Sequence, residues 1–511
     1  MRVRGLWAVI AGCLFMGLAA PAVAQAPESF AGRKAHRLDA ARLKALTDFV
    51  ETSRQALGVP GVSLGIVQDG QTLFAGGFGV REQGRPEAAD ADTLYLVASN
   101  TKPLTTLMLA KLVDEGRLDW ETPVADLMPA FRLADAETTG KVRVKHLLCA
   151  CTGLPYRNLD WEFAPPDAPE TLAFDTLSRM SSARPFGSSY SYSNPIAAAG
   201  GFVGGHVAHP ELALGWAYDR AMAERVFGPL GMTRSTFDFD RAMQGNYARA
   251  YGVNPLGELA EVDPARNRQM HAVRPTGGAW SSVNDLLAYV RMELADGLLP
   301  DGTRYISSAA LKARSDAQVS TGAASWYGMG LDTTTASGVT VRYHGGRLYG
   351  FRGDTIWLPE HGVGVVILMN ASTGNVLMEA LPRKLLEVLF DGRPLADGMV
   401  AAAAATDRQR RETSRQAVRY PADAAAVAAL APRYRNAILG GLKVEQAAGQ
   451  TVFAFDAWTT PVASRAGADG APIFVAMAPS PTFPFTPGKA GDRRTLTIRE
   501  GQTDFVFVET D

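Results

Sequence analysis

Three short groups of residues have types and spacings that could perform chemistry, and the first combines a serine with a lysine. Ser99 and Lys102 stand three positions apart in Ser99-Asn100-Thr101-Lys102, the only Ser-x-x-Lys spacing in the chain. Positions i and i+3 share one face of a helix, so the amine of Lys102 can reach the Ser99 hydroxyl and activate this weak nucleophile. At a helix N-terminus, free backbone N–H groups would also favour developing negative charge near Ser99. The alternative is an ordinary polar first turn.

The second group is Tyr192-Ser193-Asn194, which precedes a stretch of small residues. A phenol beside an ammonium group loses its proton more easily, so Tyr192 could act as general base and then as acid. The amide of Asn194 can bind Lys102 and a substrate carbonyl. The Tyr-x-Asn pattern also occurs at 156–158 and 434–436. The sequence context favours Tyr192, with Tyr156 second.

The third group is His344-Gly345-Gly346, expected to end a strand over residues 339–343. Two glycines let a substrate backbone approach a strand closely. A histidine there can hydrogen-bond a substrate or tune neighbouring pKa values. The alternative is a turn with an exposed histidine.

The surrounding pattern predicts the elements that position these groups. A helix over 39–57 and a hairpin formed by 62–67 and 72–78 precede Ser99. Three strands at 339–343, 354–358 and 363–369 follow late in the chain. A helix is expected next over 375–390, with Pro382 as a possible break. Sequential strands joined by tight turns pair antiparallel. The predicted fold class is therefore α/β: an antiparallel sheet built from both ends of this region and flanked by helices, plus a helical subdomain from the middle.

Changes in residue composition and hydrophobic pattern along the chain predict the domain boundaries. Residues 28–395 form the α/β domain, 396–419 with their alanine run form a linker, and 420–511 form a small all-β, barrel-like domain. Three aromatic residues of that domain are expected to fill the barrel: Trp458, Phe483 and Phe485.

Composition excludes several classes of protein. The 511 residues are 47% hydrophobic and 20% charged, with a formal net charge of −1, which is typical of a folded globular protein. No continuous basic stripe occurs, so nucleic acid is not an expected partner. Of the three cysteines, Cys149 and Cys151 stand two apart. We expect this spacing to be poor geometry for a disulfide and the pair to be buried packing.

Residues 1–24 have the pattern of a cleavable signal peptide. Arg2 and Arg4 precede an apolar stretch over 6–20, and Ala22-Val23-Ala24 form a small-residue cleavage site. The expected mature protein is periplasmic or secreted, without stable membrane insertion after cleavage. An uncleaved anchor and lipoprotein processing at Cys13 are the alternatives.

In this order, and with the phrases that frame them, the three groups resemble the serine β-lactamase and penicillin-binding-protein superfamily over about residues 40–390. The framing phrases are Leu118-Asp119 through Pro129, His146 through Pro155, Pro229 through Thr233, and Pro275 through Ser281. The resemblance implies that Ser99 is the acyl-forming nucleophile, Lys102 its activating partner, Tyr192 the general base and Asn194 a positioning residue. It also implies substrate binding at His344, Gly345 and Gly346, with the backbone N–H groups of Ser99 and Arg347 forming an oxyanion hole.

One departure from the pattern bears on the substrate. Class C β-lactamases and carboxypeptidases usually carry Lys-Thr-Gly where this chain has His344-Gly345-Gly346, so the ammonium and hydroxyl that hold a substrate carboxylate are absent. The third group looks more like that of D-aminopeptidases, of archaeal relatives with a C-terminal lipocalin-like domain, and of family VIII carboxylesterases. Arg347 could restore anion binding or could face solvent.

The expected function is an exported serine hydrolase that acts through an acyl-enzyme on small amides, D-residue peptides or short esters. The alternatives are a non-catalytic or weakly active protein that binds penicillin or peptidoglycan peptides, and a true β-lactamase. The expected chemistry needs no metal and no organic cofactor. Neither the substrate bond nor the oligomeric state is defined by the sequence.

Overall fold

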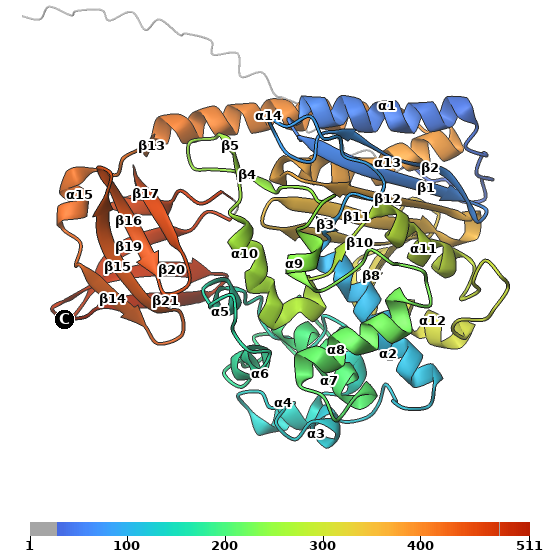
Figure 1. Ribbon diagram of the computed structural model, residues 1–511, viewed down its shortest axis with the longest axis horizontal. Helices are drawn as coiled ribbons and strands as arrows, with labels where there is room; N and C mark the ends of the chain where they lie inside the picture. Colours follow the sequence, from blue (N-terminus) through green and yellow to red (C-terminus); the bar gives the residue numbers. More distant parts are fainter. Residues whose placement is uncertain (1–27, 480) are drawn as a thin grey trace, which may run out of the picture.

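The computed structural model describes residues 28–479 and 481–511, so the predicted signal peptide lies outside the described residues. The chain forms a large α/β part and a β-barrel beside it (Figure 1). These two parts have the architecture that the sequence predicts.

An eight-stranded antiparallel sheet is the centre of the α/β part, with the order β2-β1-β12-β11-β10-β9-β8-β7. Strands β1 and β12 pair side by side, with Val62 opposite Met369. This pairing confirms that the two ends of the α/β region build one sheet. The strands are β1 Gly61–Gln68, β2 Gln71–Gly79, β7 Val319–Gly322, β8 Ser325–Tyr327, β9 Asp332–Thr334, β10 Val341–Leu348, β11 Phe351–Leu358 and β12 Val363–Met369.

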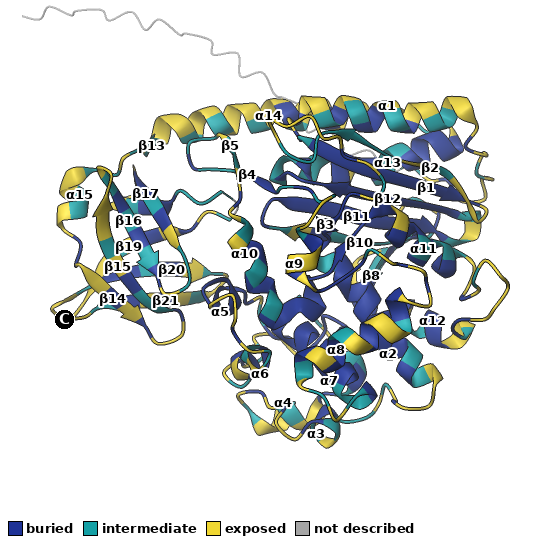
Figure 2. Ribbon diagram, in the orientation of Figure 1, coloured by how far each residue is buried: buried dark blue, intermediate teal, exposed yellow. Residues whose placement is uncertain are grey.

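Alternating side chains of the sheet supply two separate hydrophobic cores, as period-two strands do. In β12, Val365 and Ile367 pack with helices α1 (Ala40–Ala56), α13 (Asn375–Phe390) and α14 (Ala396–Ala417). Val366 and Leu368 face the opposite core, which contains the helical layer. The central strands β1, β11 and β12 are therefore buried on both faces, as their dark colour in Figure 2 shows.

The helical layer lies below the sheet in Figure 1 and includes α2, α7, α8 and α11. Its helices are α2 Thr101–Asp114, α3 Val124–Leu127, α4 Ala136–Lys141, α5 Leu159–Glu162, α6 Thr171–Leu177, α7 Asn194–Ala208, α8 Leu214–Met222, α9 Phe239–Ala242, α10 Pro264–Arg268, α11 Val283–Leu294 and α12 Ser308–Ser315. Two small ladders connect them, β3 Tyr95–Leu96 with β6 Trp280–Ser281, and β4 Tyr251–Val253 with β5 Leu259–Glu261.

Strands β10 and β11 (Phe351–Leu358, predicted as 354–358) differ in extent from the prediction, whereas helix α13 has the predicted bounds. Strand β10 does not end before His344 but continues to Leu348, because Gly345 and Gly346 pair with Asp354 and Gly353 of β11. Helix α13 continues through Pro382, and its apolar face is buried against α1 and the sheet.

The segment between the two domains is mostly helix rather than an irregular linker. Helix α14 packs through Ala396, Val400 and Ala404 in the same core as α1 and α13. Its remaining turns are largely exposed (Figure 2). The alanine run at 401–405 favours this helix, because alanine has the highest helix propensity.

The C-terminal domain is a closed barrel of eight antiparallel strands, β14 to β21, in which β17 and β18 pair to complete the ring. Phe483 and Phe485 are buried in its core and Trp458 packs against it. Phe163, which follows α5, joins this core and lies 5.0 Å from the ring of Phe455. The elements are β13 Val418–Arg419, α15 Ala424–Ala428, β14 Arg433–Asn436, β15 Gly440–Ala447, β16 Gln450–Phe455, β17 Thr459–Ala466, β18 Pro472–Ala476, β19 Pro484–Ala490, β20 Arg493–Glu500 and β21 Thr503–Glu509.

The expectation for the two cysteines was half wrong. Cys149 and Cys151 are buried as predicted, but they form a disulfide. Ala150 between them has a φ of +49°, in the left-handed region, and the two Cα atoms lie 5.1 Å apart. An extended backbone would hold residues i and i+2 on the same face but about 6.6 Å apart, and this local turn brings the two cysteines closer.

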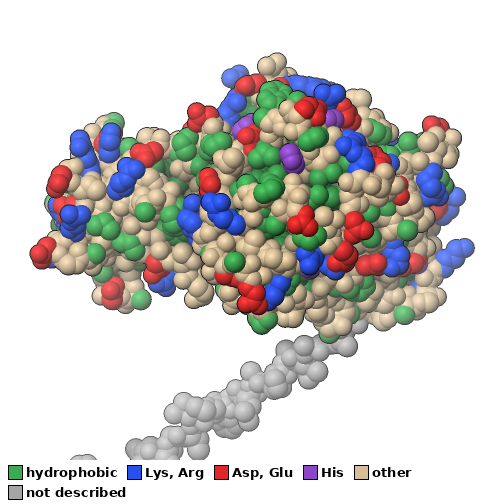
Figure 3. All heavy atoms as spheres, turned by 90° about the horizontal axis from the view of Figure 1, so that it is seen from below, with side chains coloured by type: hydrophobic (Ala, Val, Ile, Leu, Met, Phe, Trp, Pro, Cys, Tyr) green, Lys and Arg blue, Asp and Glu red, His purple; other side chains and the backbone are tan. Residues whose placement is uncertain are grey.

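Within residues 28–479 and 481–511, no helix has the length and apolar character that crossing a bilayer requires. On the face shown in Figure 3, basic and acidic side chains are interspersed.

Candidate active site

Ser99 lies on a single 3-10 turn, Ala98–Asn100, that leads into α2 beside strand β10. Ala98 has a φ of +50°, an uncommon conformation for a residue with a Cβ atom, and one that tends to cluster at functional sites. Asn100 holds the turn to the sheet: its Nδ2 donates to the Gly353 carbonyl at 3.2 Å, and its Oδ1 accepts from Thr355 at 2.8 Å. The sheet therefore fixes the position of Ser99.

Lys102 is buried in the first turn of α2, and its Nζ atom lies 3.2 Å from Ser99 Oγ. Nζ also donates to Asn194 Oδ1 and to the Thr276 carbonyl, both at 2.8 Å. Burial holds the pKa of Lys102 well below its ordinary value. A neutral amine has two N–H groups for these two acceptors and a lone pair left for the Ser99 hydroxyl, which is the arrangement of a general base.

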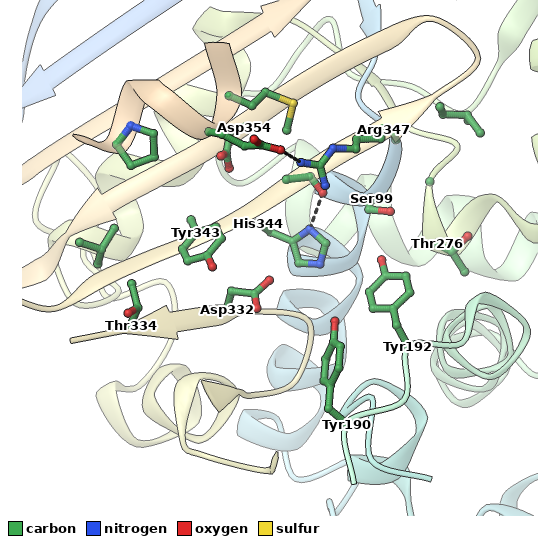
Figure 4. A pocket seen from close by; sticks show the side chains of 18 of the residues that line it. Ser99, Tyr190, Tyr192, Thr276, Asp332, Thr334, Tyr343, His344, Arg347 and Asp354 are labelled. Atoms are coloured by element: carbon green, nitrogen blue, oxygen red, sulfur yellow. Dashed lines mark hydrogen bonds and ion pairs between the residues drawn. The ribbon is translucent and has the colours of Figure 1, made fainter. Parts of the chain in front are cut away.

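Tyr192 lies in the loop before α7 and faces both residues. Lys102 Nζ is 4.7 Å from the centre of its ring, and its hydroxyl points toward Ser99 (Figure 4). Burial raises the pKa of Tyr192, and the interaction with the Ser99 hydroxyl only partly opposes the rise. The expectation that a neighbouring ammonium would lower this pKa is wrong, because burial makes the amine itself less basic. Tyr192 is a neutral phenol at rest.

His344 lies on β10 with its ring near Tyr192, 6.4 Å between centroids (Figure 4). Its Nδ1 lies 2.9 Å from the Gly345 carbonyl and its Nε2 3.0 Å from the Tyr327 hydroxyl. A carbonyl only accepts, so Nδ1 carries the proton and Nε2 accepts from Tyr327. Burial, and then the repulsion that Lys102 exerts when it is protonated, lower the pKa of His344 to about 3. His344 is thus buried and neutral, not an exposed turn histidine.

The two glycines and the arginine after His344 have different surroundings. Gly346 packs on the Ser99 turn, and a Cβ there would lie 2.3 Å from the Val97 carbonyl oxygen. The guanidinium of Arg347 is half-exposed and contacts Asn375 at 3.2 Å and Glu379 at 3.4 Å. Figure 4 shows it turned away from Ser99. Strand β9 pairs with β10 only at 341–343, so no strand covers the edge of β10 from His344 onward among the described residues.

Ser99, Tyr192, Asn194 and His344 line one cavity of about 810 Å³. Two carboxyl groups also line it, from Asp332 on β9 and Asp354 on β11. Neither forms an ion pair within the described part of the chain, and Asp354 Oδ1 is buried without a hydrogen-bond partner. Burial raises the pKa of Asp332 to about 7 and that of Asp354 well above its ordinary value.

Sequence reasoning missed three residues that hold this site together. Thr276 supplies the carbonyl that accepts from Lys102, and it falls within the Pro275–Ser281 phrase that framed the resemblance. Tyr327 orients His344, and no local pattern marks it. Asn158 belongs to the second Tyr-x-Asn group, and it accepts a hydrogen bond from Asn194 at 2.9 Å.

Comparison with known proteins identifies the family of the α/β domain. The family model described as Beta-lactamase matches residues 46–390. Penicillin-binding protein 4 of Amycolatopsis lactamdurans is 28% identical over 337 residues, 64% of this chain and 85% of that protein. Unguisins hydrolase ungD' of Aspergillus campestris is 26% identical over 366 residues, 68% of this chain and 66% of its own.

Two solved structures share the fold. The octameric penicillin-binding protein homologue from Pyrococcus abyssi aligns with a TM-score of 0.60 and 19% identity, over 91% of this chain and all of that one. The Beta-Lactamase/D-Alanine Carboxypeptidase from Pseudomonas syringae aligns with a TM-score of 0.56 and 20% identity, over 68% of this chain and 99% of its own. The family model matches more than half of the length of this chain, and the chain therefore belongs to the beta-lactamase family of serine hydrolases.

Proposed function

We propose that the protein is an exported serine hydrolase that forms an acyl-enzyme on Ser99 with small amides, D-residue peptides or short esters. The observation that carries the proposal is the placement of Lys102 Nζ 3.2 Å from Ser99 Oγ, with two further acceptors occupying its N–H groups. This arrangement prepares the amine to take the serine proton as the acyl bond forms.

The remaining residues have roles that follow from their protonation. Tyr192, a neutral phenol in contact with Ser99, is placed to return a proton to the leaving group and then to help a water molecule deacylate the enzyme. Asn194 positions Lys102. We assign the oxyanion hole to the backbone N–H groups of Ser99 and Arg347, as the resemblance implies.

The charges of the cavity favour neutral or cationic substrates over those that carry a carboxylate. His344 is neutral at the position where Lys-Thr-Gly would supply an ammonium group, and the Arg347 guanidinium is engaged with Glu379. Asp332 and Asp354 add two carboxyl groups to the wall, whose pKa values burial raises and which an approaching substrate cation would ionise. An ester or an amide with a free amino group fits this wall better than a penicillin or a peptide C-terminus does.

Relatives support the reaction class. One is named a penicillin-binding protein and another a hydrolase of unguisins, so both binding and hydrolysis occur in the family. Export rests on the signal-like residues 1–24 alone, and an N-terminus at Gln25 in protein recovered outside the cytoplasm would support it.

The test compares the purified protein with Ser99→Ala on three substrates: a p-nitrophenyl ester of a short acid, a D-alanine p-nitroanilide and a chromogenic cephalosporin. We expect Ser99-dependent turnover of the ester or the anilide, and little of the cephalosporin. Ser320→Ala, an exposed serine on β7 outside the cavity, is the matched control and should keep wild-type rates. Turnover that survives Ser99→Ala would refute the assignment, and no turnover in any protein would favour a binding protein.

A further inference from the structure

One loop of the α/β domain lies between the barrel and the candidate active site. It runs from Tyr156 through helix α5 to Phe163, and its apolar residues Leu159 and Phe163 belong to the barrel core. Asn158 and Trp161 are buried in the same loop. The loop is therefore held by the barrel on one side and contacts the residues around Ser99 on the other.

A continuous series of hydrogen bonds crosses this loop. Glu500, at the end of β20 in the barrel, accepts from the backbone N–H groups of Asn158 at 2.8 Å and of Leu159 at 3.4 Å. Asn158 Oδ1 accepts from Asn194 Nδ2 at 2.9 Å, and Asn194 Oδ1 accepts from Lys102 Nζ at 2.8 Å. Asn158 and Asn194 thus connect a barrel carboxylate to the amine beside Ser99.

The series has a direction that Trp161 sets. An indole N–H can only donate, and Trp161 Nε1 donates to Asn158 Oδ1 at 3.2 Å. The Asn158 amide must therefore present its oxygen to Trp161, and its Nδ2 donates to the Tyr156 hydroxyl. Asn194, which faces the same oxygen, must offer its NH₂ group. Its own oxygen is then left for Lys102.

The opposite orientation of Asn194 would place an NH₂ group against the amine of Lys102. One N–H group of Lys102 would lose its acceptor, and the lone pair would turn toward the donor of Asn194 instead of the Ser99 hydroxyl. The orientation of a single amide thus decides whether Lys102 can act as a base.

We infer that Asn158, Trp161 and Glu500 are positioning residues for the nucleophile, so that the C-terminal barrel is a working part of the hydrolase site. The inference rests on the proposed function of Ser99. Glu500 holds the loop backbone, Trp161 sets the Asn158 amide, and Asn158 sets Asn194. None of the three touches the reacting atoms, and each acts through the next.

The surroundings of Glu500 make its hold on the loop backbone depend on pH. The ionisable groups that face it are Arg157, Asp160, Glu162 and Tyr156. Burial raises its pKa to about 7, with two backbone N–H groups opposing the rise. Above that pH the carboxylate accepts from both N–H groups, and below it the neutral acid holds them less strongly.

The test uses a fluorophosphonate, which reports on the activation of Ser99 without requiring the natural substrate. In this reaction the Ser99 Oγ–phosphorus bond forms, fluoride leaves, and the serine proton passes to Lys102 Nζ. Rates of labelling are measured from pH 5.5 to 8.5 for the full-length mature protein, Glu500→Gln and Trp161→Phe. The control is Glu509→Gln, a barrel carboxylate that pairs with Arg494 away from the loop.

At pH 8.5 we expect Glu500→Gln and Trp161→Phe to react about tenfold more slowly than wild type, because one lost hydrogen bond in the series is worth on the order of the 1.4 kcal/mol to which a tenfold change in rate corresponds. Glu509→Gln should react at the wild-type rate. Because Gln resembles protonated Glu, the ratio of wild type to Glu500→Gln should fall toward one at pH 5.5, whereas the deficit of Trp161→Phe should not. A merely structural role would not produce this pH dependence.

Two negative results have separate meanings. Wild-type protein that is not labelled at Ser99, with Ser99→Ala as the blank, would refute the proposed function and with it this inference. The inference alone would be overturned if wild type is labelled at Ser99 and Glu500→Gln and Trp161→Phe are labelled at the wild-type rate. It would also be overturned if the control Glu509→Gln is labelled as slowly as those two variants. Melting temperatures identify a variant that fails to fold. If Glu500→Gln does not fold, the labelling rate of Trp161→Phe alone tests the inference.

Discussion

Gly346 of strand β10 packs directly on the carbonyl oxygen of Val97, at the start of the turn that carries Ser99. A Cβ atom at position 346 would lie 2.3 Å from that oxygen and 3.2 Å from the Ala98 Cβ. Since neither neighbour is the end of a flexible side chain, any larger residue must move the turn. The distance between β10 and Ser99 therefore depends on this glycine.

Gly346→Ala should accordingly damage catalysis more than stability. We expect a loss of about 1–3 kcal/mol in the free energy of unfolding from overpacking, and a fall of roughly 100-fold in kcat/KM because Ser99 is displaced. The matched variant is Gly345→Ala, whose Cβ would meet only the mobile end of Met378 at 3.0 Å. Steady-state kinetics on the preferred ester or anilide should show a much smaller loss for Gly345→Ala. Equal losses would contradict this account.

Lys102 should make stability depend on pH. Burial holds its folded pKa well below its ordinary value of 10.5, so the unfolded chain binds more protons between those two pKa values. Stability therefore rises with pH across that window. Melting temperatures from pH 6 to 9.5 should show wild type gaining on Lys102→Met as pH rises, although the variant is inactive. Parallel curves would mean that Lys102 keeps an ordinary pKa.

His344 should make the free energy of unfolding sensitive to acid. Its folded pKa is lowered to about 3 from an ordinary 6.5, so protons favour the unfolded state as pH falls through this range. From pH 6.5 to 5, wild type should lose roughly 1.6 kcal/mol more stability than His344→Gln. Denaturant unfolding at several pH values measures the difference. A wild type no more sensitive to acid than the variant would show that His344 is protonated in the fold.

Phe163 should hold the barrel against the α/β domain. Its ring contacts Phe455, Trp458 and Phe483 at centroid distances of 5.0 to 5.3 Å. Phe163→Ala should cost about 3–5 kcal/mol in the free energy of unfolding or of barrel docking. Limited proteolysis near α14 and small-angle scattering should both report release of the barrel. Phe78→Ala, on β2 far from the barrel, is the control, and an unchanged proteolytic pattern in Phe163→Ala would contradict the prediction.

Much of the fold could be predicted because it depends on neighbours in the chain. Asp39 caps α1 by accepting from the Arg42 N–H, three residues on, and Asp69-Gly70 turns β1 into β2. The apolar run of β12 begins and ends where the sequence pattern places it. Ser99 and Lys102 met as predicted for the same reason, because one helical turn is a local structure.

Only the tertiary structure decided the properties that depend on burial and on distant partners. The left-handed Ala150 joins Cys149 to Cys151, the burial of Lys102 and Tyr192 sets their protonation, and Arg347 finds its partner on α13. Glu500 reaches Asn158 across 342 residues of chain. Spacing along a sequence determines which side chains share a turn, whereas the solvation of a charge and the orientation of an amide depend on every atom packed around them.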